Sequence, residues 1–375
     1  MDFDYVVLPA LIVLAAAAGI WITIRRIRSG GRSSHSRWRK LVERIVLSLV
    51  ILILAVAGTS SGYNAIALYI DRHPAPGKIY SVDGYPMRLD CTGIGSPTVI
   101  LETGGGGTGL GWAGVQPTLA KTTRVCSYDR AGMGWSDTQP GPRDANHVAT
   151  QLHALLGAAG IQGPLVLVGA SLGGPFIREY ASRYPSEVVG LVFVDARPPL
   201  LGRNPIVKAY DSRTAVSPLR IFLARAEFIL GIPRLRGRCS GPIQGLGADT
   251  ALSRHADECH QSFDEGKAET EAISLSDSEA EHTGPYGNMP ILILSADIQT
   301  QASRGWPRDL LKIGDQLQED MKNLSTRSLR IIAKGSGHGI TGERPDLVEK
   351  EIPLFVERIR GTVPPPTDYG ATVTE

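Results

Sequence analysis

The sequence has almost no net charge. Its 375 residues include 39 lysines and arginines against 37 aspartates and glutamates, a formal net charge of +2 at pH 7. Proteins that bind nucleic acid present a basic surface to the phosphates. The basic residues that cluster here lie between two apolar segments, within residues 25–44, where membrane topology accounts for them. This pattern excludes nucleic acid as a partner.

Cysteine is scarce as well, with four residues in the whole chain. These cysteines suit an oxidising compartment. Cys239 and Cys259 lie close together in a polar stretch, which predicts a disulfide bond between them. Cys91 and Cys126 lie in strand-like runs, and we expect them to be buried thiols.

The amino end lacks the pattern of a cleaved signal peptide. Residues 1–5 carry acidic instead of basic side chains, and no small-residue cleavage site follows the first apolar run. That run, residues 5–24, is long enough to cross a bilayer as a helix, and residues 45–66 form a second apolar segment. The loop between them, residues 25–44, is strongly basic through Arg25, Arg26, Arg28, Arg32, Arg37, Arg39 and Lys40.

These segments predict a multi-pass membrane anchor over residues 1–72. The positive-inside rule places the basic loop in the cytoplasm. The amino terminus and the remainder of the chain, from residue 73 onward, are therefore expected on the extracytoplasmic side.

Residues 164–174 join an apolar, β-branched run to the pattern Gly-x-Ser-x-Gly, and a helix-compatible sequence follows at once. This is the pattern of a nucleophile elbow. Gly169 and Gly173 flank Ser171 because side chains there would collide across a tight turn from strand to helix. The turn raises the Ser171 hydroxyl to the carboxyl edge of a sheet. The N–H of Leu172, at the helix start, points to where an oxyanion would develop.

A serine nucleophile requires a general base. In chains with a nucleophile elbow, the serine, the acid and the histidine follow in that order along the sequence. His338 follows the strand-like residues 328–334 on a glycine-rich loop, so we predict it to be the base. Two aspartates end strand-like runs between the serine and the histidine. Asp195 and Asp297 are both candidates to orient the imidazole, and the one that does not is expected to cap a turn.

Strand-like and helical segments alternate from residue 78 onward, which predicts a parallel sheet flanked by helices. Four glycines at 104–107 follow the third strand, where a second oxyanion donor is expected, and we assign the N–H of Gly105 to it. Residues 198–288 are polar and irregular, which predicts a lid. The most apolar part of this lid, residues 219–232, is expected to form its core, with a pocket wall as the alternative. Residues 362–375 are predicted to be a disordered tail.

Residues 78–361 resemble the α/β-hydrolase superfamily. Three motifs carry the resemblance: the turn at 129–136 that includes Asp129, Arg130, Gly132 and Gly134, the elbow at 169–173, and the histidine loop at 335–338. The resemblance implies an eight-stranded, mostly parallel sheet over residues 73–361, a Ser171 nucleophile, a His338 base, a two-N–H oxyanion hole, and no cofactor or metal.

Two positions depart from the family pattern. Thr103-Gly104 stands where many members have His-Gly after the third strand. Gln299 occupies the usual place of the acid after the seventh strand, whereas Asp195 matches members with an acid after the sixth. The resemblance therefore favours Asp195 over Asp297.

These features together predict a membrane-anchored serine hydrolase of the carboxylesterase or lipase type, which acts on a small-molecule or lipid ester. An acyltransferase would use the same triad, and a catalytically silent membrane-bound binding protein would retain only the fold. A haloalkane dehalogenase is disfavoured because its nucleophile would be a carboxylate, and position 171 is serine. The sequence leaves the oligomeric state and the natural substrate open.

Overall fold

A computed structural model describes residues 8–28, 37–71, 75–239, 259, 263–367 and 369–375. The chain divides into two compact units. A helical unit comprises Met1–Pro74 and Val216–Ser240, and a sheet unit comprises Ala75–Ala215 and Gly241–Glu375.

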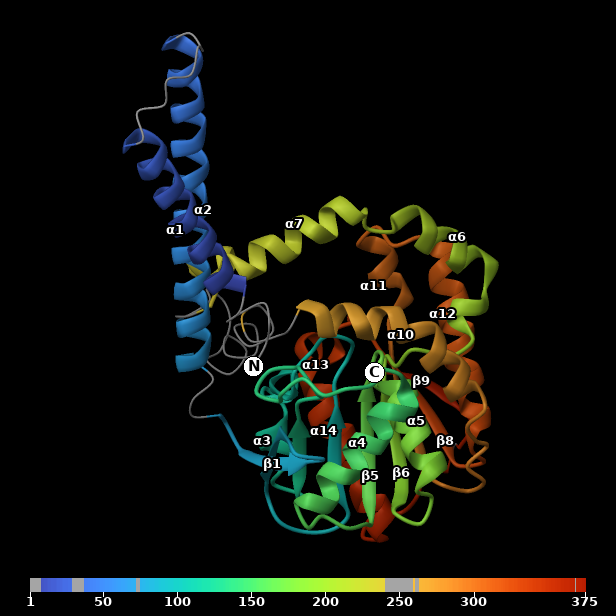
Figure 1. Cartoon of the computed structure of the whole chain (residues 1–375). Helices are drawn as coiled ribbons and strands as arrows, with labels where there is room; N and C mark the ends of the chain where they lie inside the picture. Colours follow the sequence, from blue (N-terminus) through green and yellow to red (C-terminus); the bar gives the residue numbers. More distant parts are fainter. Residues whose placement is uncertain (1–7, 29–36, 72–74, 240–258, 260–262, 368) are drawn as a thin grey trace. The chain divides into compact units, whose positions relative to one another are not determined.

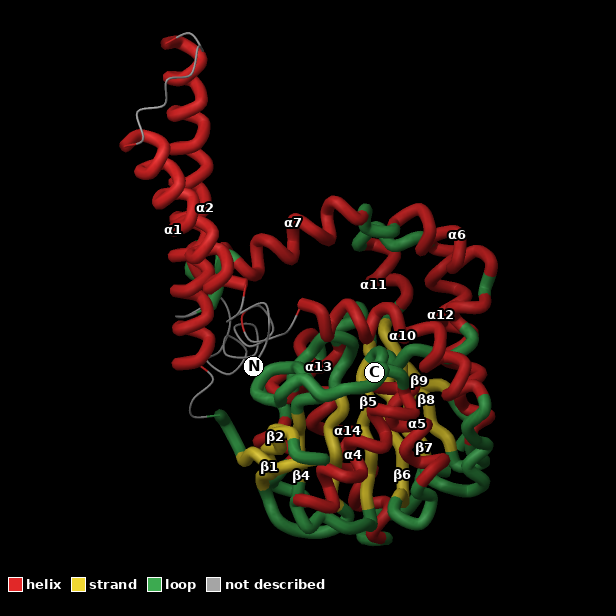
Figure 2. The backbone as a smooth tube through the Cα atoms, viewed as in Figure 1, coloured by secondary structure: helices red, strands yellow, loops and turns green. Residues whose placement is uncertain are grey.

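The sheet unit contains a nine-stranded sheet in the order β1-β2-β4-β3-β5-β6-β7-β8-β9. Strands β1 and β2 pair antiparallel, as do β2 and β4, and the other neighbours pair parallel. Figure 2 shows the strands in yellow between helices. The strands are β1 (Lys78–Val82), β2 (Tyr85–Thr92), β3 (Thr98–Glu102), β4 (Val125–Tyr128), β5 (Leu165–Ala170), β6 (Val188–Val194), β7 (Ile291–Ala296), β8 (Ser328–Ala333) and β9 (Thr372–Thr374).

Helices cover both faces of this sheet (Figure 1). Side chains of β5 alternate between two apolar cores: Leu165 and Leu167 pack with helices α4 and α5, whereas Val166 and Val168 pack with α3 and α14. This arrangement confirms the predicted fold class. The helices of the sheet unit outside the β6–β7 insertion are α3 (Gln116–Leu119), α4 (Ala145–Ala158), α5 (Gly173–Arg183), α11 (Ile298–Ser303), α12 (Arg308–Asp320), α13 (Ile340–Glu343) and α14 (Pro345–Arg360).

The carboxyl end supplies the ninth strand. Residues 362–375 were predicted to be disordered, but β9 pairs in parallel with β8, and the N–H of Lys334 donates to the carbonyl of Glu375 at 2.7 Å. The prolines at 364–366 indicated disorder, whereas the β-branched run Thr372, Val373 and Thr374 favours a strand once an open sheet edge is available. The prediction of a disordered tail is wrong for these residues.

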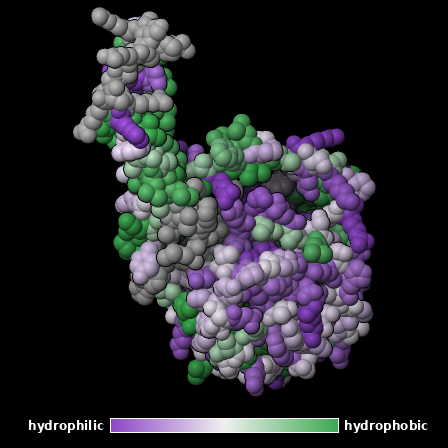
Figure 3. Space-filling view, viewed as in Figure 1, coloured by the Kyte–Doolittle hydropathy of each residue, from purple (hydrophilic) through white to green (hydrophobic). Residues whose placement is uncertain are grey.

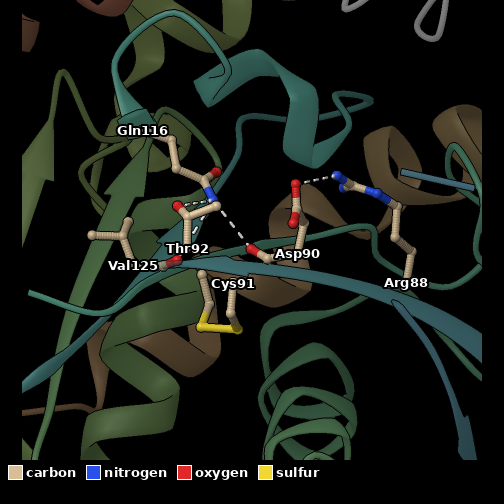
Figure 4. The surroundings of a disulfide bond; sticks show 7 residues. Arg88, Asp90, Cys91, Thr92, Gln116 and Val125 are labelled. Carbon is tan, nitrogen blue, oxygen red and sulfur yellow. Dashed lines mark hydrogen bonds and ion pairs between the residues drawn. A yellow bond between two sulfur atoms is a disulfide. The ribbon is translucent and has the colours of Figure 1, made fainter. Parts of the chain in front are cut away.

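A disulfide bond joins Cys91 on β2 to Cys126 on β4 (Figure 4). The antiparallel register sets the two residues directly opposite each other, with 4.0 Å between their Cα atoms. The expectation of two buried thiols was therefore wrong, because the sequence alone did not pair these strands. Cys239 and Cys259 are also disulfide-bonded.

The insertion between β6 and β7, which was predicted to be a lid, is divided between the two units. Residues 216–240 belong to the helical unit, and the helices before and after them belong to the sheet unit. Residues 240–258 lie outside the described part of the chain. The insertion contains η3 (Leu201–Arg203), α6 (Pro205–Thr214), α7 (Pro218–Ile229), α8 (Ile232–Leu235) and α10 (Phe263–Glu281).

The helical unit contains both predicted amino-terminal helices, as α1 (Leu8–Arg28) and α2 (Arg37–Asp71). Within the described residues, one stretch is long and apolar enough to cross a membrane, Leu41–Ile70 of α2, and α1 has the shorter apolar stretch Ala10–Arg25. The two helices pack closely, since a Cβ on Gly58 would lie 2.7 Å from the Val13 side chain. Much of the predicted loop at 25–44 is helical, and its residues 29–36 are outside the described ranges.

Candidate active site

Ser171 lies on a sharp turn between β5 and α5. Its backbone φ is +50°, a left-handed conformation that non-glycine residues seldom adopt. A Cβ on Gly169 would lie 2.6 Å from the Gly173 carbonyl oxygen, and one on Gly173 would lie 2.8 Å from the Thr103 carbonyl oxygen. Only glycine fits at these two positions, for the steric reason that the sequence suggested.

The Ser171 side chain begins a chain of hydrogen bonds. Its hydroxyl oxygen lies 3.0 Å from Nε2 of His338, and Nδ1 of His338 lies 2.6 Å from Oδ2 of Asp195. The other Asp195 oxygen accepts the backbone N–H of Ala296 on the neighbouring strand at 3.0 Å. Three side chains from the ends of β5, β6 and β8 therefore meet at the carboxyl edge of the sheet, where this architecture binds its ligands.

The hydrogen bonds of Ser171, His338 and Asp195 fix the orientation of the imidazole. An ionised Asp195 accepts the Nδ1 proton, which leaves the Nε2 lone pair free to accept the Ser171 hydroxyl proton. The hydrogen bond to Asp195 raises the pKa of His338 above its ordinary 6.5, against the opposing effect of burial, and the charges of Asp195 and Glu343 add to the rise. The His338 side chain is 59% exposed and Asp195 13%, so the imidazole can reach a substrate while the acid lies behind it.

Asp297, the other candidate acid, caps a helix. It accepts the N–H of Gln299 at 2.9 Å and the hydroxyl of Thr300 at 2.8 Å, which satisfies the first turn of α11. It also accepts the N–H of Gly335 at 3.2 Å and so steadies the loop that precedes His338. In the described ranges, none of its hydrogen bonds reaches the imidazole.

The two predicted oxyanion donors lie beside the serine. A Cβ on Gly105 would lie 3.1 Å from the Leu172 side chain, and one on Gly104 would lie 3.2 Å from Cβ of Ser171. The N–H groups of Gly105 and Leu172 have no acceptor among the residues that the structure describes. The neighbouring N–H of Gly107 is used within the turn, where it donates to the Gly104 carbonyl at 3.2 Å.

Arg130 binds the backbone at the start of the glycine loop, residues 104–107. Its guanidinium is buried and donates to the carbonyls of Thr103 at 3.1 Å and Gly104 at 2.8 Å. It also donates to the carboxylates of Glu102 at 2.5 Å and Glu269 at 2.6 Å. From the sequence, Arg130 was noted only as part of a family motif. In the structure its guanidinium donors connect the glycine loop to two buried carboxylates.

Glu269 joins helix α10 of the insertion to the same loop. Its Oε2 accepts the N–H of Gly106 at 2.7 Å and an Arg130 N–H at 3.0 Å. The Glu269 side chain is 1% exposed and that of Arg130 is 2% exposed, so this ion pair is buried. No sequence signal pointed to Glu269, because nothing in the local pattern pairs residues so far apart.

A cavity of about 550 Å³ opens onto Ser171, His338, Asp195 and Gly105. Residues 219–232, predicted as lid core or pocket wall, do not line it, and Leu219, Phe222 and Leu223 are exposed. In the described part of the chain, no three His, Cys, Asp or Glu side chains gather as a metal site would require. The cavity walls are mostly apolar and include Leu201, Val207, Ile273, Ile298, Trp306 and Leu311.

Known proteins resemble part of the chain. A family model described as the alpha/beta hydrolase fold matches residues 97–213. The chain is 27% identical over 241 residues to an uncharacterised protein of Schizosaccharomyces pombe, a match that covers 64% of this chain and 42% of that protein. It is 25% identical over 287 residues to an AB hydrolase superfamily protein of Gibberella zeae, which covers 70% of this chain and 87% of the relative.

Solved structures agree on the fold. A thermophilic esterase from Thermogutta terrifontis has a TM-score of 0.51 and 20% identity, with 76% of this chain and 99% of the esterase covered. At this identity the likeness concerns the fold alone. The strand order, the strained serine turn and these relatives lead to one conclusion. The chain belongs to the α/β-hydrolase superfamily.

Proposed function

We propose that the protein is a serine hydrolase that cleaves a carboxylic ester through an acyl-enzyme on Ser171. One observation carries the proposal: the Ser171 hydroxyl lies 3.0 Å from Nε2 of His338, whose Nδ1 lies 2.6 Å from Asp195. A hydroxyl is a weak nucleophile at neutral pH, and this arrangement is what activates it.

Acylation follows from the geometry. Nε2 of His338 removes the Ser171 proton as the serine oxygen bonds to the ester carbonyl carbon, and the carbonyl oxygen becomes an oxyanion. The N–H groups of Gly105 and Leu172 donate to this oxyanion. The imidazolium, stabilised by Asp195, then gives its proton to the alkoxide that leaves. The products are an alcohol and an ester on Ser171.

Deacylation repeats the sequence with water in place of serine. His338 takes a proton from the water as its oxygen attacks the acyl carbon, and then returns the proton to the Ser171 oxygen as that bond breaks. The same two N–H groups stabilise the second oxyanion. A carboxylic acid leaves and the free serine is restored.

The cavity favours an ester with an apolar acyl or alcohol group. Its walls are mostly apolar side chains, and the two arginines among them, Arg197 and Arg330, are both paired with carboxylates. A volume of about 550 Å³ lies in the range of sites for drug-sized molecules. We propose a lipid or amphiphilic ester as the substrate class.

We also propose that α1 and α2 both cross a membrane and hold the sheet unit on its extracytoplasmic side. The apolar stretch Leu41–Ile70 of α2 supports the attachment, and the basic residues between the helices support the orientation. The disulfide between Cys91 and Cys126 is independent support, because structural disulfides persist in oxidising compartments.

A fluorophosphonate probe on detergent-solubilised protein tests the catalytic proposal. Wild type should be labelled, and Ser171→Ala and His338→Ala should not. Ser295→Ala is the matched control: this serine also lines the cavity, but its hydroxyl lies against Arg330 instead of a histidine. Labelling that survives Ser171→Ala would refute the proposal. A folded wild type that neither labels nor hydrolyses esters would favour a binding protein.

A further inference from the structure

Helix α7 of the helical unit has an exposed apolar face. Leu219, Phe222 and Leu223 are 65%, 66% and 51% exposed. Together with Ala226 they recur at intervals of three and four residues, which places them on one side of a helix. Large apolar side chains exposed side by side indicate a surface that is covered by something else. In Figure 3 the apolar colour covers much of α1 and α2 and recurs over α7.

The carboxyl end of α7 is tied to the apolar helix α2. The hydroxyl of Ser60 donates to the carbonyl of Leu230 at 2.7 Å, and the amide of Asn64 donates to the carbonyl of Phe228 at 3.1 Å. Phe228 belongs to the last turn of α7, and Leu230 is the residue that caps the helix. A Cβ on Gly231 would lie 2.6 Å from Cβ of Asn64, so glycine permits the close approach.

The length of α2 places this junction at a defined depth. A helix needs about 20 residues to cross the hydrocarbon core of a bilayer. Counted from Ile45, which follows the charged Glu43 and Arg44, that length ends near Asn64. With α2 across the membrane, as proposed above, the Ser60 and Asn64 contacts to α7 lie at the far boundary of the core. The exposed aromatic side chain of Tyr63 is of the type enriched at such a boundary.

The charge of the same segment matches a lipid surface. Residues 216–240 contain five arginines and one glutamate. Arg220 and Glu227 lie on the flank of α7 next to the apolar face and are exposed. A basic helix with an apolar face is typical of helices that lie in the membrane interface, where anionic headgroups attract the arginines.

We propose that α7 is an interfacial helix that lies along an anionic membrane surface with Leu219, Phe222 and Leu223 inserted among the lipids. The proposal rests on the membrane attachment through α2 proposed above. The polar insertion of the hydrolase is then fixed to the bilayer at a second place, distinct from the transmembrane segment itself.

A site-specific fluorescent probe tests this placement in the full chain. All four native cysteines are disulfide-bonded, so a new cysteine is the one free thiol for labelling under non-reducing conditions. Phe222→Cys carries the probe on the apolar face, and Arg220→Cys is the matched control on the polar flank. Both proteins are reconstituted into vesicles of phosphatidylcholine and phosphatidylserine, and quenching by aqueous iodide and by nitroxide-labelled lipid is measured.

We expect lipid nitroxide to quench the probe at position 222 more strongly than the probe at position 220. Aqueous iodide should quench the probe at position 220 more strongly than the probe at position 222. In a Leu219→Ser, Leu223→Ser background, iodide should regain access to the probe at 222. Equal iodide quenching at both positions would overturn the proposal. Protection from both quenchers at 222 would also overturn it, since a protein surface, such as a second copy of the chain, would then cover the face.

Carbonate extraction of the same vesicles separates this proposal from the one on which it rests. Protein that carbonate releases has no transmembrane anchor, and the attachment through α2 fails. Protein that stays in the membrane while the probe at 222 remains in water refutes only the interfacial placement of α7.

Discussion

Replacing Glu269 by glutamine should slow catalysis although the residue contacts no part of the triad. Both oxygens of Glu269 accept hydrogen bonds, one from Arg130 and one shared between Arg130 and the N–H of Gly106. Glutamine keeps the shape but offers one oxygen and one NH₂ group. The NH₂ group of glutamine would then face an N–H donor of Arg130 or Gly106, and one of these hydrogen bonds is lost. The glycine loop, which carries the Gly105 N–H, is held less firmly as a result.

The size of the effect can be bounded. Loss of a complete oxyanion donor costs about 10²–10³ in kcat, and a misplacement of about 1 Å costs about 10². Glu269→Gln displaces the loop without deleting the donor, so we expect kcat to fall about 10- to 100-fold, with a smaller change in KM. Stability should fall by about 2 kcal/mol, because charged hydrogen bonds to a buried arginine are lost while Glu102 still pairs with it.

Glu265→Gln is the matched control. Glu265 lies one turn earlier on α10, is also buried, and pairs with Arg143 at 2.5 Å. It therefore attaches the same helix to the sheet unit but makes no contact with the glycine loop. Both variants should lower the midpoint of thermal unfolding similarly, and only Glu269→Gln should slow ester hydrolysis and fluorophosphonate labelling.

An equal loss of activity in Glu269→Gln and Glu265→Gln, at a temperature where both are folded, would refute a specific role of Glu269 in the glycine loop. The effect of the substitution would then be general destabilisation. Full activity of Glu269→Gln would refute this role as well. A change confined to KM would point to a role of Glu269 in the wall of the cavity, which it also lines.

Three further predictions concern the triad and the elbow. Asp195→Asn should lower kcat about 10⁴-fold by stabilising the wrong imidazole tautomer, whereas Asp297→Asn should cost about 1 kcal/mol of stability as a lost helix cap and leave most activity; steady-state kinetics and thermal unfolding separate them. Only neutral His338 is a base, so its raised pKa predicts that kcat/KM falls to half its plateau at a pH above 6.5 as the pH is lowered, and a midpoint below that value would contradict this. Gly173→Ala should abolish probe labelling, because its Cβ would lie 2.8 Å from the Thr103 carbonyl oxygen, and a labelled variant would show that the turn can relax.

The parts of the site that depend on local sequence could be predicted. The elbow at Ser171 follows from an apolar strand, two glycines and a helix start within eleven residues. His338 follows from its place after the last long strand. The strand ends alone left both Asp195 and Asp297 open as the acid. The resemblance favoured Asp195, and the hydrogen bonds of the structure support that choice.

Features that depend on distant pairing could not be predicted. Cys91 and Cys126 lie 35 residues apart, and their bond requires knowing that β2 neighbours β4. β9 forms only because the edge of β8 is open. The apolar character of residues 219–232 predicted a lid core or a pocket wall, whereas α7 leaves its apolar face exposed.

Helix α10 shows why periodicity fails in the insertion. Its buried face is built from residues at intervals of four, Glu265, Glu269, Ile273 and Asp277, so three of the four are carboxylates. Because the pattern of apolar residues is missing, the sequence of this helix looks polar and irregular. Each carboxylate is paired with an arginine from a different place in the sheet unit: Arg143, Arg130 and Arg197.

The Arg130 and Arg143 pairs are buried and the Arg197 pair is partly buried. Such pairs add little net stability over apolar contacts, because desolvation of the charges offsets most of their attraction. What the pairs determine is the position of α10 on the sheet unit. A carboxylate separated from its arginine costs about 3–5 kcal/mol when it remains buried. A shift of α10 by one residue would break all three pairs at once, so a single register satisfies them. Since Glu269 is the member that also holds Gly106, the same pairs that fix the helix set the distance between the glycine loop and Ser171.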